Sequence, residues 1–306
     1  MDGDGVVRRA EALAAGFSDA ELQRFVARGT FERIRPGAYC RAGVLADLGV
    51  EGRHALGVRA TAAVVGKGCA ASYESAAVLL GLELWRADFR RSHFTVSRSG
   101  GGRRTARLHL HAAAFDPDEV VEVDGIPVLG PTRTVIDLAR SLPFEEAVVV
   151  GDAAVRKYDL RHEDLHSALA RRPHRPGAAQ ARRVIDFLDG RSESVGESRS
   201  RVRMSRHHLP TPVPQYTVLD AQGKFVARVD FYLPDHGVIG EFDGAAKYGR
   251  LLKPGQTPGN VVYQEKLRED RLRDLGYEIV RWTWSDLDTF HHVATRFHRA
   301  MARAHR

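Results

Sequence analysis

The heptapeptide VIGEFDG, residues 238–244, is the most informative segment of this 306-residue chain. Its apolar start predicts a β-strand, and in a strand Glu241 and Asp243, two positions apart, project from the same face. The preceding segment, residues 224–233, alternates apolar and polar residues and predicts a second strand, which carries Asp230. Acidic side chains are therefore expected at the ends of two neighbouring strands.

Carboxylates placed this close to one another need a counter-charge. They repel and raise each other's pKa unless a cation lies between them. Oxygen ligands of this kind suit Mg²⁺ or Mn²⁺, which polarises a phosphodiester and lowers the pKa of a bound water, so the pattern predicts phosphodiester hydrolysis. The alternative is that Glu241 and Asp243 are edge-strand charges paired with Arg228 or Lys247.

The elements around these two strands follow a definite order. A helix is expected over residues 195–206, with Glu197 in its first turn, and residues 214–219 predict a strand that precedes the other two. Residues 261–275 have the spacing of a helix, and residues 277–283 predict a buried strand. The pattern therefore predicts an α/β core with the order helix, three strands, helix, strand.

This order, with the stretches RVDF, EFDGAAKYG and EKLREDRLRDLGYEIVRWTW, resembles the PD-(D/E)XK nuclease superfamily. More narrowly, it resembles the branch related to very-short-patch-repair endonucleases. The residue pattern predicts Asp230, Glu241 and Asp243 as metal ligands, and the resemblance implies a restriction-endonuclease-like core in which Asp230 and Glu241 have this role. It also implies that Glu197 supports them from the leading helix. Gln215, in the first strand, is a weaker part of the same motif.

One position departs from the superfamily pattern. That pattern has a lysine two places after the second acidic residue, where this chain has Asp243, and the next lysine is Lys247. Either Lys247 has taken over the catalytic role of positioning the attacking water, or hydrolysis is impaired and only nucleic-acid binding remains. Glu265, Lys266 and Arg268 of the following helix either complete the site or form a salt-bridged helix face.

The first 45 residues have the layout of a winged helix-turn-helix. Helical patterns over residues 6–15 and 19–28 precede a hairpin over residues 31–41, and Ser18 is a good N-cap for the second helix. Two short helices and a hairpin with surface arginines also describe many protein–protein modules, so both interpretations stay open. The side chains expected to contact nucleic acid are Gln23, Arg24 and Arg28 of the second helix and Arg33 and Arg35 of the hairpin.

The order of these first elements resembles the amino-terminal domain of AbiEi-type antitoxins, which are DNA-binding autorepressors. The resemblance continues through SYESAA, residues 72–77, and PTRTVIDLAR, residues 131–140. It implies a toxin from the same operon as a partner. The chain is therefore expected to have three domains, which are a winged helix-turn-helix over residues 1–45, an AbiEi-like α+β middle domain over residues 46–190, and a PD-(D/E)XK nuclease-like domain over residues 191–306.

The middle region suggests no definite chemistry. Strands are expected between residues 93 and 112, and His109 and His111, two positions apart, face the same side of the second one. Without a third ligand they are expected to be a surface pair and not a metal site. Cys40 and Cys69 have no metal-ligand spacing and are expected to be buried, reduced thiols.

The overall composition is that of a globular protein with a basic surface. Lysine and arginine total 46 against 39 aspartates and glutamates, a formal charge of +7. This balance favours a polyanionic partner, although an arginine-rich coding bias produces the same excess. No apolar run approaches the roughly 18 residues that cross a bilayer, so no membrane association is expected and the cytoplasm is the expected compartment.

Two functions agree with these patterns. The first is a Mg²⁺- or Mn²⁺-dependent DNA endonuclease, in which the N-terminal module holds the duplex and the carboxylates bind the metal ion. The alternative is an antitoxin-like DNA-binding transcriptional regulator whose nuclease-like domain is catalytically silent and serves binding or homodimer formation. The sequence does not separate DNA from RNA as the substrate of a nuclease.

Overall fold

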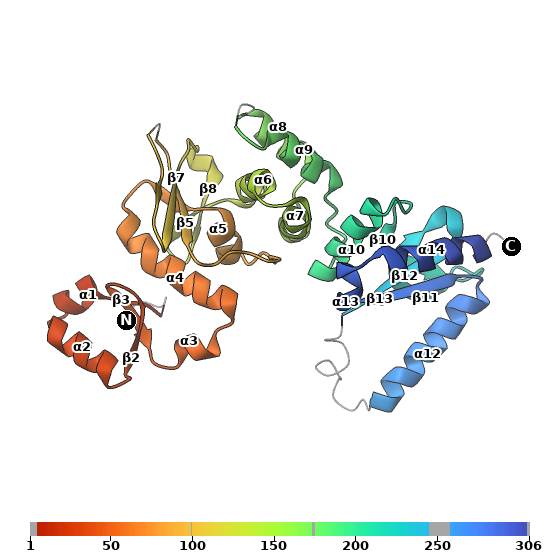
Figure 1. Cartoon of the computed structure of the whole chain (residues 1–306), viewed down its shortest axis with the longest axis horizontal. Helices are drawn as coiled ribbons and strands as arrows, with labels where there is room; N and C mark the ends of the chain where they lie inside the picture. Colours follow the sequence, from red (N-terminus) through yellow and green to blue (C-terminus); the bar gives the residue numbers. More distant parts are fainter. Residues whose placement is uncertain (1–4, 99, 173–174, 245–257, 305–306) are drawn as a thin grey trace. The chain divides into compact units, whose positions relative to one another are not determined.

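The computed structural model divides into two compact units, Met1–Leu188 and Asp189–Arg306 (Figure 1). The structure describes residues 5–98, 100–172, 175–244 and 258–304. Within these ranges, no helix combines the length and the apolar character that a bilayer span requires. The predicted mixture of helices and strands, arranged in more than one sheet, is confirmed.

The first unit begins with a small antiparallel sheet of strand order β1-β3-β2, flanked by two helices. The helix predicted over residues 6–15 is wrong in its first turn, because Val7 and Arg8 extend along β3 instead. Cys40 in β3 is a buried free thiol, as predicted, and so is Cys69 further along the chain. The elements are β1 (Val7–Arg8), α1 (Arg9–Ala14), α2 (Asp19–Ala27), β2 (Phe31–Arg35) and β3 (Ala38–Arg41).

Helix α2 is held by its cap and by its buried face. The Ser18 hydroxyl accepts a hydrogen bond from the Glu21 backbone N–H at 3.3 Å, and the Glu21 carboxylate accepts one from the Ser18 N–H at 2.8 Å. This reciprocal pair confirms the predicted N-cap. Leu22, only 2% exposed, packs against Ala12 and Tyr39, which fixes the rotation of α2 about its axis.

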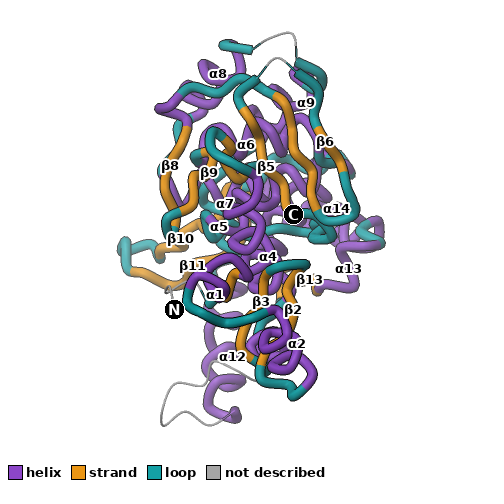
Figure 2. Tube along the Cα trace, turned by 90° about the vertical axis from the view of Figure 1, so that its left-hand side faces the viewer, coloured by secondary structure: helices purple, strands orange, loops and turns teal. Residues whose placement is uncertain are grey.

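A six-stranded mixed sheet of order β6-β7-β5-β4-β9-β8 forms the centre of the first unit (Figure 2). Strand β5 runs parallel to β7, and β4 runs parallel to β9, while the other neighbours are antiparallel. Its strands are β4 (Cys69–Ala71), β5 (Ser92–Val96), β6 (Arg103–Arg104), β7 (Leu108–Ala112), β8 (Val120–Val123) and β9 (Ile126–Leu129). Helices α3 (Val44–Asp47) and α4 (Val50–Val65) precede β4, and helix α5 (Tyr73–Leu79) and the 3₁₀ turn η1 (Pro117–Glu119) connect strands of this sheet.

Helices follow this sheet and pack on one another. Their facing sides are apolar, and Leu138, Val150 and Ile185 are fully buried between them. Pro143 separates the first two, because its ring prevents the preceding residue from continuing a helix. These helices are α6 (Pro131–Ser141), α7 (Phe144–Tyr158), α8 (His162–Ala170) and α9 (Ala178–Phe187).

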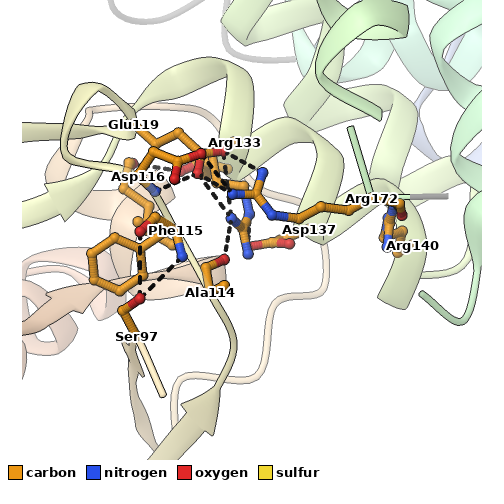
Figure 3. Close-up of polar contacts among 11 residues, drawn as sticks. Ser97, Ala114, Phe115, Asp116, Glu119, Arg133, Asp137, Arg140 and Arg172 are labelled. Atoms are coloured by element: carbon orange, nitrogen blue, oxygen red, sulfur yellow. Dashed lines mark hydrogen bonds and ion pairs between the residues drawn. The ribbon is translucent and has the colours of Figure 1, made fainter. Parts of the chain in front are cut away.

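A buried ion-pair network joins α6 to the segment that leads into β8 (Figure 3). Arg133, 4% exposed, donates from Nε to Asp137 Oδ2 at 2.9 Å and from Nη1 to the Ala114 carbonyl at 3.3 Å. Glu119 lies 3.5 Å from Arg133 Nη1 and also accepts from Arg172 at 2.7 Å. Burial alone would lower the pKa of Arg133, but the Asp137 and Glu119 carboxylates raise it, so the guanidinium stays charged.

The second unit is built on a four-stranded sheet of order β10-β11-β12-β13, in which only β12 and β13 are parallel. The four strands lie within one residue of the predicted ranges at each end. The helices are α10 (Val195–Arg206), the 3₁₀ turn η2 (Pro234–His236), α12 (Pro258–Asp274), α13 (Trp284–Asp288) and α14 (His291–Ala304). The strands are β10 (Val213–Leu219), β11 (Phe225–Leu233), β12 (Val238–Asp243) and β13 (Glu278–Thr283).

Helices cover both faces of this sheet, with α12 on one side and α14 on the other (Figure 1). On the α14 side, Trp282 is 1% exposed and packs with Phe297 and with Met204 of α10. On the α12 side, Leu272 is fully buried against Ile239 and its neighbours. The predicted order of helix, three strands, helix and strand is confirmed for the second unit, whereas the division of the chain into three domains stays a prediction.

Replacing Arg133 by alanine is expected to lower the free energy of unfolding of the first unit by about 3–5 kcal/mol, because it leaves Asp137 as a buried charge without its main partner and removes one of the two arginines beside Glu119. Urea denaturation followed by circular dichroism measures this loss. The matched control is Arg161→Ala, which breaks the exposed pair with Asp164 and is expected to leave stability unchanged within error. Equal effects of the two substitutions would contradict a stabilising role for the network.

Gly196→Ala is expected to destabilise the second unit by about 1–3 kcal/mol through overpacking. A Cβ at Gly196 would lie 1.9 Å from Cε1 of Phe242, so helix α10 would have to move away from β12. Denaturation followed by tryptophan fluorescence measures the effect, because two of the three tryptophans, Trp282 and Trp284, lie in the second unit. Gly57→Ala in α4 is the control, because a Cβ at Gly57 would meet no atom within 4 Å and helix propensity favours alanine.

Candidate functional site

Asp230 and Glu241 lie across from one another on β11 and β12. The antiparallel register pairs Phe231 with Gly240, and its continuation brings Asp230 opposite Glu241 on the same face of the sheet. The Phe242 backbone N–H donates to Asp230 Oδ2 at 2.9 Å, which ties this carboxylate to β12. The sequence prediction that the two acidic residues share one face therefore agrees with the register.

Two arginines bind the Glu241 carboxylate. Arg268 of α12 donates to Oε1, and Arg281 of β13 donates from Nε to Oε2 at 3.1 Å. Glu265 joins the same cluster, because its Oε1 accepts from Arg268 at 2.9 Å and from Arg281 at 2.7 Å. Burial alone would lower the pKa of Arg281, but Glu241, Glu269 and Glu265 raise it. Glu241 is therefore neutralised by side chains of the protein itself.

The other predicted site residues of α12 and the strands differ in their partners and in their exposure. Glu265 and Arg268 form an ion pair on one helix face, and Lys266 is exposed. Arg228 pairs with Glu193 at 2.9 Å and not with either acidic residue of β12. Asp243, at the end of β12, is half-buried. Lys247 lies outside the described residues.

Glu197 of α10 and Gln215 of β10 extend the row of polar side chains that begins with Glu241 and Asp230. Gln215 Nε2 donates to Glu197 Oε2 at 2.8 Å, and the same carboxylate accepts from the Glu193 N–H at 2.9 Å and the Ser194 hydroxyl at 2.8 Å. Gln215 has a φ of +51°, which is strained for a residue with a side chain. It lies between two residues that pair with Phe231 and Val229, so it stands opposite Asp230. Helix α10, β10, β11 and β12 thus each contribute one polar side chain to a single row.

The donor set does not fit a resident Mg²⁺ or Mn²⁺ ion in this arrangement. Both oxygens of Glu241 accept from guanidinium groups, and a divalent cation there would face two further positive charges. Among the described residues, only three histidines of the first unit bring potential ligand atoms within 4.8 Å of one another. No three of the four carboxylates Glu197, Asp230, Glu241 and Asp243 bring oxygen atoms within 4.8 Å of one another.

The outer face of α2 carries the side chains predicted to contact nucleic acid. Gln23, Arg24 and Arg28 are exposed, and the Arg24 side chain retains 63% of its accessible surface. On the adjacent hairpin Arg33 is exposed, with its guanidinium 5.9 Å from the centre of the Tyr39 ring.

Arg35 is set apart from the exposed residues of α2 and the hairpin. Its side chain is half-buried, and burial together with the nearby Arg107 lowers its pKa. Arg107 in turn donates from Nη1 to the Ile34 carbonyl at 3.2 Å, which links the hairpin to the six-stranded sheet. Arg35 is therefore less accessible to a partner than Arg33.

Two polar residues beside the candidate sites, Arg281 and His93, were not identified from the sequence. Arg281 lies inside the apolar run YEIVRWT, where a charged residue in a buried strand was the available signal. His93 precedes His109 by 16 positions, and the two come together only because β5 and β7 pair in parallel. His109 and His111 are accordingly half-buried beside a third histidine, which corrects the expected surface pair.

Comparisons with known proteins cover different shares of the chain. Two curated relatives from Mycobacterium tuberculosis, the uncharacterized proteins Rv2248 and MT2308, are each 32% identical over 158 residues, 52% of this chain and 55% of the relative. The chain thus spans about half the length of the curated relatives it matches. The crystal structure of the RV2827C protein from the same organism aligns with a TM-score of 0.40 and 17% identity, over 70% of this chain and 83% of that one. Residues 1–42 match the family model of the transcriptional regulator AbiEi antitoxin, which confirms the predicted resemblance for this segment.

Proposed function

We propose that this chain is a DNA-binding transcriptional regulator of the AbiEi antitoxin type. The observation that carries the proposal is the match of residues 1–42 to the AbiEi family model, a segment that contains α2 and the β2–β3 hairpin. In this proposal the segment is a winged helix-turn-helix in which α2 enters a groove of the duplex and the hairpin is the wing. A toxin from the same operon is the proposed protein partner.

The geometry of α2 supports this proposal. Leu22 and the Ser18 cap hold the helix in one orientation, and that orientation leaves Gln23, Arg24 and Arg28 in solvent. Arginine suits such a surface because its planar guanidinium donates to phosphate oxygens and to guanine edges. The net charge of +7 favours the same partner.

The second unit is proposed to be a PD-(D/E)XK-like module without hydrolytic activity. Its row of polar residues follows the order of the superfamily, but Glu241 is held by Arg268 and Arg281 in place of a metal ion. Such a module would serve nucleic-acid binding or homodimer formation. A metal-dependent endonuclease is the second candidate, and it is favoured by the facing positions of Asp230 and Glu241.

Replacing Arg24 and Arg28 together by alanine is expected to weaken duplex DNA binding about tenfold and to reduce the slope of log K against log salt concentration by roughly 2, because each phosphate contact releases about one counterion. Fluorescence anisotropy with the DNA upstream of the reading frame, repeated over a salt series, measures both quantities. The control is the pair Arg171→Ala and Arg182→Ala, which removes two exposed arginines from the α8–α9 region. An equal loss in both double variants would reject α2 as the contact surface.

The wild-type chain is expected not to nick supercoiled plasmid DNA in Mg²⁺ or Mn²⁺, because the two arginines neutralise Glu241 and exclude a cation from it. Agarose gel electrophoresis of the plasmid after incubation measures this. Asp230→Asn and Glu241→Gln variants, checked for folding by circular dichroism, run beside it. Nicking by the wild type that both variants lose would establish the endonuclease and overturn the silent module.

A further inference from the structure

Three histidines of the first unit meet on one face of the six-stranded sheet. Parallel pairing of β5 and β7 places His93 beside His109 and Thr95 beside His111. Residues two apart in a strand share a face, so all three imidazoles project on the same side. Their potential ligand nitrogens lie within 4.8 Å of one another, and His93 Nδ1 is 3.1 Å from His111 Nε2.

The start of α5 packs onto these rings. The Tyr73 ring stacks on His111 with centroids 4.1 Å apart and an interplanar angle of 24°. Ser75 accepts from the His93 backbone N–H at 2.8 Å and contacts His54 Nε2 at 2.9 Å. Tyr73 itself has a φ of +51°, a strained value for a bulky residue. Helix α5 therefore packs a ring against His111 and fixes the backbone of His93.

One oxygen of a buried carboxylate lies beside the same cluster. Glu74 is 8% exposed, and its Oε2 lies 3.5 Å from His93 Nδ1 while making no hydrogen bond to any described residue. Burial raises the pKa of Glu74. A buried carboxylate of this kind is costly unless a cation or a proton donor is near it.

We propose that His93, His109 and His111 bind a divalent transition-metal ion of the zinc class, with Glu74 beside His93. Three imidazole nitrogens are ligands for Zn²⁺, Co²⁺, Ni²⁺ or Cu²⁺ and are unsuited to Mg²⁺ or Ca²⁺, which take oxygen ligands. Three protein ligands leave the fourth position of a tetrahedral Zn²⁺ open. Glu74 approaches the same His93 nitrogen that faces His111, so its carboxylate would place negative charge next to the ion.

The electrostatics of the cluster agree with this geometry. Burial and the neighbouring histidines lower the pKa of His93 to about 4 and that of His111 to about 3. Burial and the nearby Arg104 and Arg91 also lower the pKa of His109. All three rings are therefore neutral near pH 7, and each keeps the nitrogen lone pair that a metal ion needs.

The test is a Co²⁺ and Zn²⁺ titration of the full-length chain without an affinity tag, after removal of metals with a chelator. All proteins carry Asp230→Asn and Glu241→Gln, so that binding to the second unit does not contribute. One equivalent of Co²⁺ is expected to produce visible d–d absorption bands, which Zn²⁺ then abolishes. His109→Ala is expected to weaken binding by on the order of 100-fold or more, and Glu74→Gln by about tenfold.

The matched control is His166→Ala, which removes a partly exposed histidine paired with Asp186 and is expected to bind Co²⁺ as well as the parent chain. Because His109 is more accessible than the other two, its variant is the least disruptive, and circular dichroism verifies its fold. Absence of Co²⁺ bands from the parent chain at micromolar metal would overturn the site. Equal affinity of the His109 and His166 variants would do so as well. The result does not depend on DNA binding, so it can fail or succeed separately from the proposed function.

Discussion

A charged or polar side chain that is removed from water needs a partner, and this requirement organises both units of the chain. Arg133 satisfies it by holding Asp137 and Glu119, which fastens helix α6 to the edge of the large sheet. Glu241 satisfies it through Arg268 and Arg281, which join β12 to α12 and β13. The choice of partner decides the chemistry, because a carboxylate saturated by arginines resembles a structural ion pair more than a metal ligand.

Local patterns were sufficient to predict the second unit closely. Alternation of apolar and polar residues in β10, β11 and β12, and the turn residues between them, located the strands to within one residue. The same alternation predicted that Glu241 and Asp243 share a face, but it does not fix the register that brings Asp230 opposite Glu241. The arginine partners of Glu241 could not be predicted either, because Arg268 and Arg281 approach it from a helix and from a parallel strand, and a single sequence carries no signal for which distant side chains meet.

In the N-terminal segment, local patterns predicted some features and missed others. The Ser18 cap and the buried face of α2 could be predicted because both depend on residues three or four positions apart. The strand at Val7 and Arg8 could not, because it depends on pairing with β3, some 30 positions away. At these two residues, pairing with a distant strand outweighs the local helix propensity. His93 was overlooked for the same reason, since its neighbours belong to another strand.

Parallel pairing of β5 and β7 has a consequence for the assembly of the first unit. A slip of one residue between these strands would turn His109 and His111 to the opposite face and leave His93 alone. An ion that requires all three rings would bind only the correct alignment and would draw the population toward it. Binding of the ion would therefore stabilise the sheet in this register in preference to a slipped one.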